Sequence, residues 1–131
     1  MTKYNNIDGK TVLEISDDAV IANWGDSWRM PTREEFNTLL SATNNEWTTI
    51  NGVNGMLFTD KTDDSKKLFF PAVGACENGN VSYEGFIGVY WLSSLYTSNI
   101  TCGWDFFFDN KNCDMGNGLR RAGFPIRGVL D

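Results

Sequence analysis

The three cysteines are the side chains best suited to covalent or metal chemistry in this chain of 131 residues, because it contains no histidine. Cys76, Cys102 and Cys113 lack the C-x-x-C spacing of a metal site, and an odd number does not complete a disulfide framework. If Cys102 and Cys113 lie on the two strands of one hairpin, they are on the order of 20 Å apart, too far to share a metal ion. We therefore expect free, partly buried thiols, no metal or other cofactor, and no enzymatic activity.

The acidic side chains form no clear calcium site. Between residues 60 and 67 three aspartates are interspersed with lysines and the glycine of an EF-hand loop is missing, so this stretch is predicted to connect two strands. The pair Trp104-Asp105 resembles part of the W-N-D triplet of calcium-dependent lectins, but neither an E-P-N nor a Q-P-D triplet is present. The sequence therefore favours an ordinary pair of strand residues over a calcium-dependent lectin, and the absence of a calcium-induced shift in thermal stability would exclude the lectin.

Composition and charge narrow the class of protein. A hydrophobic fraction of 41% with 21% charged residues is typical of one globular domain, which we place at 1–131. The net charge of −6 argues against nucleic-acid partners, and no apolar run is long enough for membrane insertion. The first ten residues are polar, so the sequence predicts no signal peptide.

The elements that must position the chemistry are two helices followed by short strands, an α+β arrangement. An N-cap at 16–18 and a closing Gly25 bound a first helix. A capping box of Thr32 and Glu35 begins a second helix, whose Phe36 is expected in the core.

After residue 45 the pattern changes to short strands separated by polar turns. Three segments are apolar or alternating enough to be strands: 47–50, 56–59 and 68–71. Asn51-Gly52 and Asn54-Gly55 are turn signals, and the glycine-rich stretch 74–88 is predicted to be irregular.

A C-terminal hairpin is the most informative predicted element. Its turn lies at 109–112, and with Asn110-Lys111 as a two-residue loop Phe108 pairs with Cys113. Period-two alternation then divides the side chains between two faces. The inner, core face carries Trp104, Phe106, Phe108, Cys113 and Met115. The outer, exposed face carries Asp105, Phe107, Asp109, Asn112, Asp114 and Gly116.

The outer face and its flanking loops are suited to binding. A lone surface aromatic such as Phe107 is common, but the neighbouring stretches 99–101 and 116–122 hold many chemical types without a packing pattern. An aromatic centre with a polar rim is typical of a contact surface. Three arginines are instead expected to anchor loops through carboxylate or carbonyl oxygens: Arg29, Arg120 and Arg127.

Several segments together resemble a known family. Residues 24–36 read W-G-D-S-W-R-M-P-T-R-E-E-F, which is similar to the W-G-x-x-W-R-M-P-T-x-x-E-F segment of the Fibrobacter succinogenes major paralogous domain family. Three later segments also match: 70–74 (F-P-A-V-G), 90–94 (Y-W-L-S-S) and 120–129 (R-R-A-G-F-P-I-R-G-V). The resemblance implies a C-type-lectin-like fold, which formylglycine-generating enzymes also use. Leu92, Gly103 and Cys113 depart from the family pattern.

Some proteins with this fold are the variable proteins of diversity-generating retroelements, and the C-terminal pattern resembles theirs. In such proteins an error-prone reverse transcriptase rewrites selected positions on a fixed scaffold. The resemblance, together with the hairpin pattern, implies a ligand-binding surface on the outer face and its loops. The residues expected to contact a ligand are Tyr96, Asn99, Ile100, Cys102, Asp105, Phe107, Asp109, Asn112, Asp114, Gly116, Asn117, Gly118, Leu119, Arg121, Ala122 and Pro125.

These observations predict a ligand- or receptor-binding module whose partner is a protein or glycan on a target cell surface. We expect it on a phage virion or a bacterial cell surface. The alternatives are a fixed-specificity adhesion domain, an oligomer-forming structural domain, and an oxidase similar to the formylglycine-generating enzymes, for which the cysteines are poorly placed. The sequence leaves the ligand and the oligomeric state open.

Overall fold

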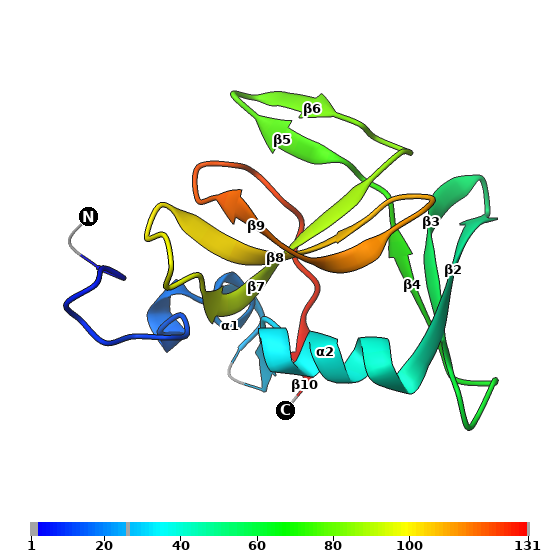
Figure 1. Cartoon of the computed structure of the whole chain (residues 1–131), viewed down its shortest axis with the longest axis horizontal. Coiled ribbons are helices and arrows are strands. Elements are labelled where there is room, and N and C mark those ends of the chain that lie inside the picture. The colour runs from blue at the N-terminus through cyan, green and yellow to red at the C-terminus, as the bar shows by residue number, and fades with distance from the viewer. Residues whose placement is uncertain (1–2, 26, 131) are drawn as a thin grey trace.

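Two helices precede most of the strands, and within the described residues the strands form four small antiparallel sheets (Figure 1). The computed structural model describes residues 3–25 and 27–130. Four residues of the predicted domain 1–131 lie outside the described residues: Met1, Thr2, Asp26 and Asp131. Asp26 also belongs to the family-like motif at 24–36. In chain order the elements are the 3₁₀ turn η1 (Ile15–Asp17), α1 (Ala19–Trp24), β1 (Trp28–Arg29), α2 (Arg33–Ala42), β2 (Thr43–Ile50), β3 (Val53–Asp60), β4 (Lys67–Pro71), β5 (Ala75–Glu77), β6 (Asn80–Ser82), β7 (Gly88–Leu95), β8 (Cys102–Phe108), β9 (Cys113–Leu119) and β10 (Val129–Leu130). Among the described helices none is both long and apolar enough to cross a membrane.

Side-chain caps set the starts of both helices. The Asp18 carboxylate accepts a hydrogen bond from the Val20 N–H at 2.9 Å, which begins α1, and Gly25 at φ +94° ends it. Thr32 Oγ1 accepts from the Glu35 N–H at 3.2 Å, and the Glu35 carboxylate accepts from the Thr32 N–H at 3.0 Å. The predicted capping box of α2 is therefore confirmed.

In the β2–β3–β4 sheet one predicted turn is confirmed and the other is wrong. Asn51 and Gly52 form the two-residue β2–β3 turn, and both have positive φ, 50° and 79°. Asn54 and Gly55 lie inside β3 and pair with β2. The reason for Gly55 is close approach, because a Cβ there would lie 2.6 Å from the Phe69 ring of β4.

The β7–β8–β9 sheet contains the predicted C-terminal hairpin. The predicted register is confirmed, with Phe108 opposite Cys113 and Phe106 opposite Met115. After Trp91 a bulge interrupts the pairing of β7 with β8, which resumes where Leu95 lies opposite Gly103, and residues 93–95 also hydrogen-bond to partners in other segments. These partners are the backbone of 11–13 and the carbonyl of Pro31. The segment that precedes α1, residues 3–18 (the N-terminal segment), is thereby attached to the edge of the sheet.

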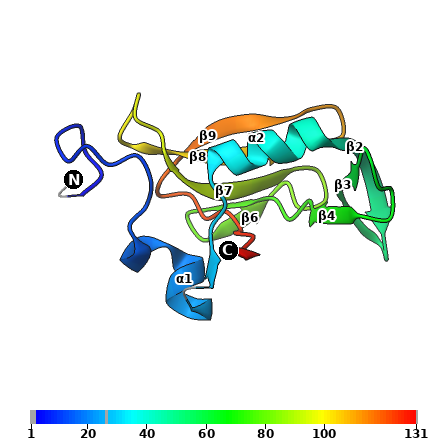
Figure 2. The ribbon, with the colours of Figure 1, turned by 90° about the horizontal axis from the view of Figure 1, so that it is seen from below.

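An aromatic core lies between α2 and the inner face of β7–β8–β9. Phe36 of α2 packs on Phe106 with ring centroids 4.6 Å apart, and Phe70 of β4 lies 5.7 Å from each of them. Figures 1 and 2 show α2 along this face of the sheet. Phe106 and Phe108 are fully buried, and burying each such side chain contributes about 2 kcal/mol. The predicted inner face is therefore core.

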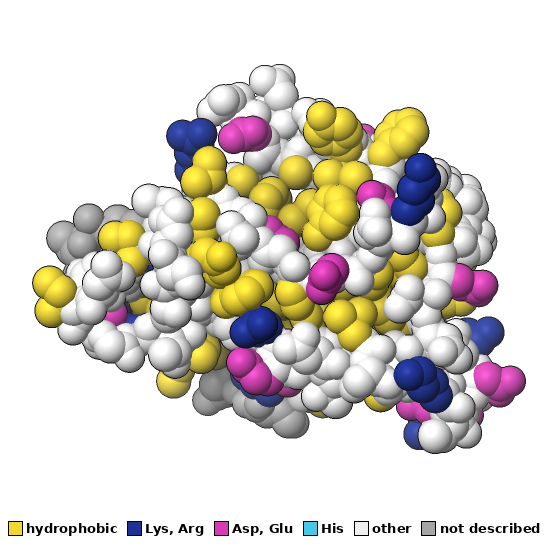
Figure 3. All heavy atoms as spheres, viewed as in Figure 1, with side chains coloured by type: hydrophobic (Ala, Val, Ile, Leu, Met, Phe, Trp, Pro, Cys, Tyr) yellow, Lys and Arg dark blue, Asp and Glu magenta, His cyan; other side chains and the backbone are white. Residues whose placement is uncertain are grey.

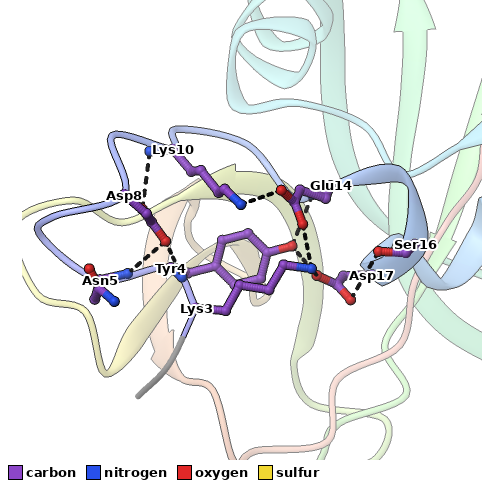
Figure 4. A network of polar contacts seen from close by, with 8 residues as sticks. All are labelled: Lys3, Tyr4, Asn5, Asp8, Lys10, Glu14, Ser16 and Asp17. Atoms are coloured by element: carbon purple, nitrogen blue, oxygen red, sulfur yellow. Dashed lines mark hydrogen bonds and ion pairs between the residues drawn. The ribbon is translucent and has the colours of Figure 1, made fainter.

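A network of polar contacts fixes the N-terminal segment before α1 (Figure 4). The Lys3 ammonium forms ion pairs with Glu14 and Asp17, and the Tyr4 hydroxyl donates to Asp17 and accepts from the Glu14 N–H at 3.0 Å. The hydrogen bond from Lys3 holds the pKa of Asp17 below its usual value. Arg120 donates to the Tyr4 carbonyl at 3.2 Å, so the segment is also tied to the residues that follow β9.

The predicted anchoring arginines all contact carboxylate or carbonyl oxygens. Arg29 binds both carboxylate oxygens of Glu35, at 2.6 and 2.9 Å, and lowers the pKa of Glu35 to about 2. Arg127 donates to the Phe69 carbonyl at 2.9 Å. Arg120 Nε donates to the Cys102 carbonyl at 3.2 Å, in addition to its contact with the N-terminal segment.

Candidate binding surface

The outer face of the β8–β9 hairpin carries the central residues of the predicted surface. Alternation along β8 points Asp105 and Phe107 to this face, and the register places them opposite Gly116 and Asp114. Asp114 is exposed and Phe107 is half-buried. Strand pairing alone therefore brings these four residues together.

Asp105 is buried, which corrects the expectation of an exposed acid on this face. The residue is only 4% exposed, and its carboxylate extends over β9. Oδ1 lies 2.7 Å from the position that a Cβ would take at Gly116, and Oδ2 lies 3.0 Å from that of Gly118. Within residues 3–25 and 27–130 the carboxylate has no hydrogen-bond or ion-pair partner. Burial raises its pKa to about 6.

The chain after β9 folds back over this sheet. Phe124 lies on Trp91 of β7 with ring centroids 4.3 Å apart, and the Trp91 N–H donates to the Pro125 carbonyl at 3.1 Å. Gly123 and Cys76 of β5 exchange two backbone hydrogen bonds of 2.7 Å. The segment is therefore fixed between β5 and β7, and Pro125 is half-buried and bonded through its backbone.

An exposed aromatic turn beside this face is the part of the surface that sequence reasoning missed. The stretch 74–88, predicted to be irregular, contains the β5–β6 hairpin, and the turn after it carries Tyr83 and Phe86, which are 68% and 72% exposed. Gly88 pairs with Phe108, so this turn enters the sheet at the end where the β8–β9 turn lies. Figure 3 shows hydrophobic side chains gathered over β8–β9 and up to the β5–β6 hairpin. The only signal in the sequence was the aromatic residues themselves, set between glycines.

The predicted loop residues lie at the opposite end of the hairpin, beside the N-terminal segment. Tyr96 packs edge to face on Trp104 with ring centroids 4.8 Å apart. Asn99 is exposed, and its Oδ1 accepts a hydrogen bond from the Thr101 N–H at 3.0 Å. Ile100 lines a hollow of about 240 Å³ between this loop and the N-terminal segment. These residues therefore form a group separate from the outer face.

The remaining predicted residues lie at the hairpin turn and along β9. The Asp109 carboxylate accepts from the N–H groups of Lys111 at 2.8 Å and Asn112 at 2.7 Å, which preorganises the turn and holds the pKa of Asp109 below its usual value. Arg121 Nη2 forms an ion pair with Glu77 Oε1 of β5 at 3.8 Å. The exposed members of this set are Asn112, Asn117, Leu119 and Arg121, and the half-buried ones are Asp109, Gly118 and Ala122.

All three cysteines are free thiols, as the sequence predicts. Cys102, which the sequence places among the predicted ligand contacts, is buried in this structure. It pairs with Leu119 at one end of the β8–β9 ladder, whereas Cys113 pairs with Phe108 at the other end. Burial raises the pKa of Cys113 to about 11. Over the described part of the chain no cluster of three or more Cys, Asp or Glu side chains is arranged to hold a metal ion.

Comparisons with known proteins add no relative. No protein-family model matches the chain, and no curated protein or solved structure is significantly similar to it.

Proposed function

We propose that this chain is a ligand- or receptor-binding module that acts by contact alone, through the outer face of β8–β9 and the aromatic turn at 83–87. The observation that carries the proposal is the exposure of Tyr83 and Phe86 on the turn that leads into β7, the strand that pairs with the half-buried Phe107 of β8. Large exposed rings gathered on one face of a small domain are typical of interaction surfaces. The acids at the hairpin turn favour a protein or glycan partner with basic or hydroxyl-rich patches.

The proposal also includes a C-type-lectin-like fold, diversification by a retroelement, and a location on a virion or cell surface. The order of two N-terminal helices, antiparallel strands and a C-terminal hairpin supports a C-type-lectin-like fold, together with the family-like motifs. Trp91 and Phe124, which belong to those motifs, pack on each other. Asp114, Asn117 and Arg121 are exposed on the chain that connects them. Retroelement diversification requires exposed variable positions on a fixed scaffold, and this arrangement supports it. We propose that the protein is located on a phage virion or a bacterial cell surface.

The test measures binding of the domain to intact bacterial cells and to an array of bacterial surface glycans. The biotinylated domain is presented on streptavidin, because multivalent display makes modest single-site affinity detectable. Phe86→Ser and Phe107→Ser are each expected to reduce the bound signal about tenfold. Val53→Ser removes an apolar side chain of β3 that is 44% exposed, between the half-buried Phe107 and the 72% exposed Phe86, and is expected to leave the signal unchanged. Binding retained by both phenylalanine variants, with circular dichroism confirming their folds, would overturn this surface.

The same exposed rings favour one other candidate, an oligomer-forming structural domain. In that case Phe86 would be buried between copies, and the protein would sediment as a dimer or larger assembly. Sedimentation velocity of the parent and Phe86→Ser proteins separates the candidates. An assembly dispersed by Phe86→Ser favours the structural domain, whereas a monomer in both cases favours the binding module.

A further inference from the structure

Arg33, the first residue of α2, carries a guanidinium group whose Nε has no hydrogen-bond partner among the described residues. Its Nε is buried and makes no hydrogen bond, and the guanidinium forms no ion pair within residues 3–25 and 27–130. The group lies over Trp104 of β8, with Cζ 4.0 Å from the ring centroid. An unpaired buried donor of a charged group costs stability, so a retained one calls for an explanation.

A polar hollow of about 490 Å³ opens beside this arginine. Tyr96 and Trp104 provide aromatic walls, and the hydroxyl-bearing side chains of Ser94, Thr97 and Ser98 also line it. Ser94 Oγ accepts the Arg33 backbone N–H at 2.9 Å, so its own O–H remains able to donate. The hollow therefore offers a cation, hydroxyl donors and ring faces within one enclosure.

We propose that this hollow binds an acidic saccharide, with the sugar's oxyanion on the Arg33 guanidinium and its ring against Tyr96. A carboxylate or phosphate group can accept from Nε and an Nη together, which would satisfy the buried donor after a small side-chain movement. Aromatic walls with hydroxyl-rich lining suit a sugar ring better than a bare anion. Glu34 also lines the hollow and can accept sugar hydroxyls, but its charge limits the ligand to one oxyanion there.

This subsite is independent of the proposed outer-face surface, because Trp104 belongs to the inner face of the sheet. Loss of ligand binding at the outer face is therefore not expected to remove binding at the Arg33 subsite, or the reverse. Phe107→Ser should weaken outer-face binding about tenfold and leave binding at the Arg33 subsite unchanged, which makes the two proposals separable by experiment.

The experiment titrates the isotope-labelled full chain with sodium glucuronate, glucose 1-phosphate and glucose, and follows the indole N–H resonance of Trp104. We expect saturable shifts with an acidic sugar and none with glucose, and the comparison of the two acidic sugars assigns carboxylate or phosphate. Arg33→Gln is expected to weaken binding at least about tenfold, because it removes both the positive charge and the pair of N–H donors that binds an oxyanion in bidentate geometry. Arg33→Lys should restore only part of it, because charge remains without the bidentate geometry.

Two further variants complete the design. Glu34→Gln is expected to tighten binding, because it removes the opposing charge. Lys66→Gln serves as a control, because it removes one exposed cation that does not line the hollow. Amide spectra establish that each variant is folded. The proposal is overturned if neither acidic sugar shifts the Trp104 resonance, if glucose shifts it equally, or if the shifts persist unchanged in Arg33→Gln.

Discussion

The Asp105 carboxylate fills the space above Gly116 on the neighbouring strand, with Oδ1 2.7 Å from the point where a Gly116 Cβ would lie. The two residues are directly paired in the β8–β9 ladder, so the backbone of Gly116 stays opposite the Asp105 side chain. Both positions belong to the predicted ligand-contacting set. Their identities are therefore coupled, and a larger residue at one requires a smaller residue at the other.

Gly116→Ala should test this coupling directly. We expect a loss of about 1–3 kcal/mol in the free energy of unfolding, because the new methyl group overlaps a carboxylate with little room to move. Urea denaturation measures the loss, and Asn117→Ala, at the next and exposed position of β9, is expected to change stability much less. In Asp105→Ala the same glycine substitution should cost far less, so additive costs in the double mutant would contradict a steric coupling.

Asp105 should also make stability depend on pH. Its pKa is raised from 3.8 to about 6 by burial, so folding favours the protonated acid, and stability is lost as the pH rises from about 4 through 6. Asp105→Asn removes this loss, and we expect it to be about 2 kcal/mol more stable than the parent at pH 7 and nearly equal to it at pH 4. Urea denaturation of both proteins across this range gives the difference. A constant difference from pH 4 to 8 would show that the buried carboxyl does not titrate as inferred.

Local features of the fold could be predicted because they depend on neighbouring residues. The capping box of Thr32 and Glu35 and the turn at Asn51-Gly52 each need only a few residues in sequence. The hairpin register followed from its two-residue loop and the alternation of aromatic residues. The false turn at Asn54-Gly55 shows the limit, because pairing of β3 on both edges outweighs the local signal there.

The composition of the surface could not be predicted, because it depends on what covers each face. Alternation correctly assigned Asp105 to the outer face, but its burial arises from packing of the sheet and of the chain that folds back after β9. The exposed position of Phe86 likewise depends on how the β5–β6 hairpin enters β7. Arg33 gave no signal in the sequence, since its missing partner is a property of the folded neighbourhood.

The Arg29–Glu35 contact should contribute stability through the start of α2. The guanidinium holds the pKa of Glu35 at about 2, below 4.5, so this contribution is present above pH 4.5 and lost as the pH falls towards 2. Because both side chains are partly exposed, we expect Glu35→Gln to cost only about 1 kcal/mol at pH 7, and progressively less towards pH 2. Glu34→Gln in the same helical turn is the matched control. Equal costs for the two variants in denaturation experiments would show that the ion pair is not the cause.

Natural variation of this gene should follow the exposure pattern of its C-terminal region if a retroelement diversifies it. In independent copies of the gene from one population, we expect differences to concentrate at the exposed positions Asn99, Asp114, Asn117 and Arg121, at codons that arise from adenine-bearing template positions. Trp91, Phe106 and Phe124 should remain constant, because they form the packed scaffold.

The contact between Asp105 and Gly116 makes a sharper prediction than a simple count of variable sites. Gly116 should change to a larger residue only in copies where Asp105 has also changed to a smaller one, because the two side chains compete for the same space. Sequencing many copies and tabulating the joint identities at these two positions measures the association. Changes spread evenly over the chain, or an invariant hairpin face in all copies, would instead indicate a domain of fixed specificity.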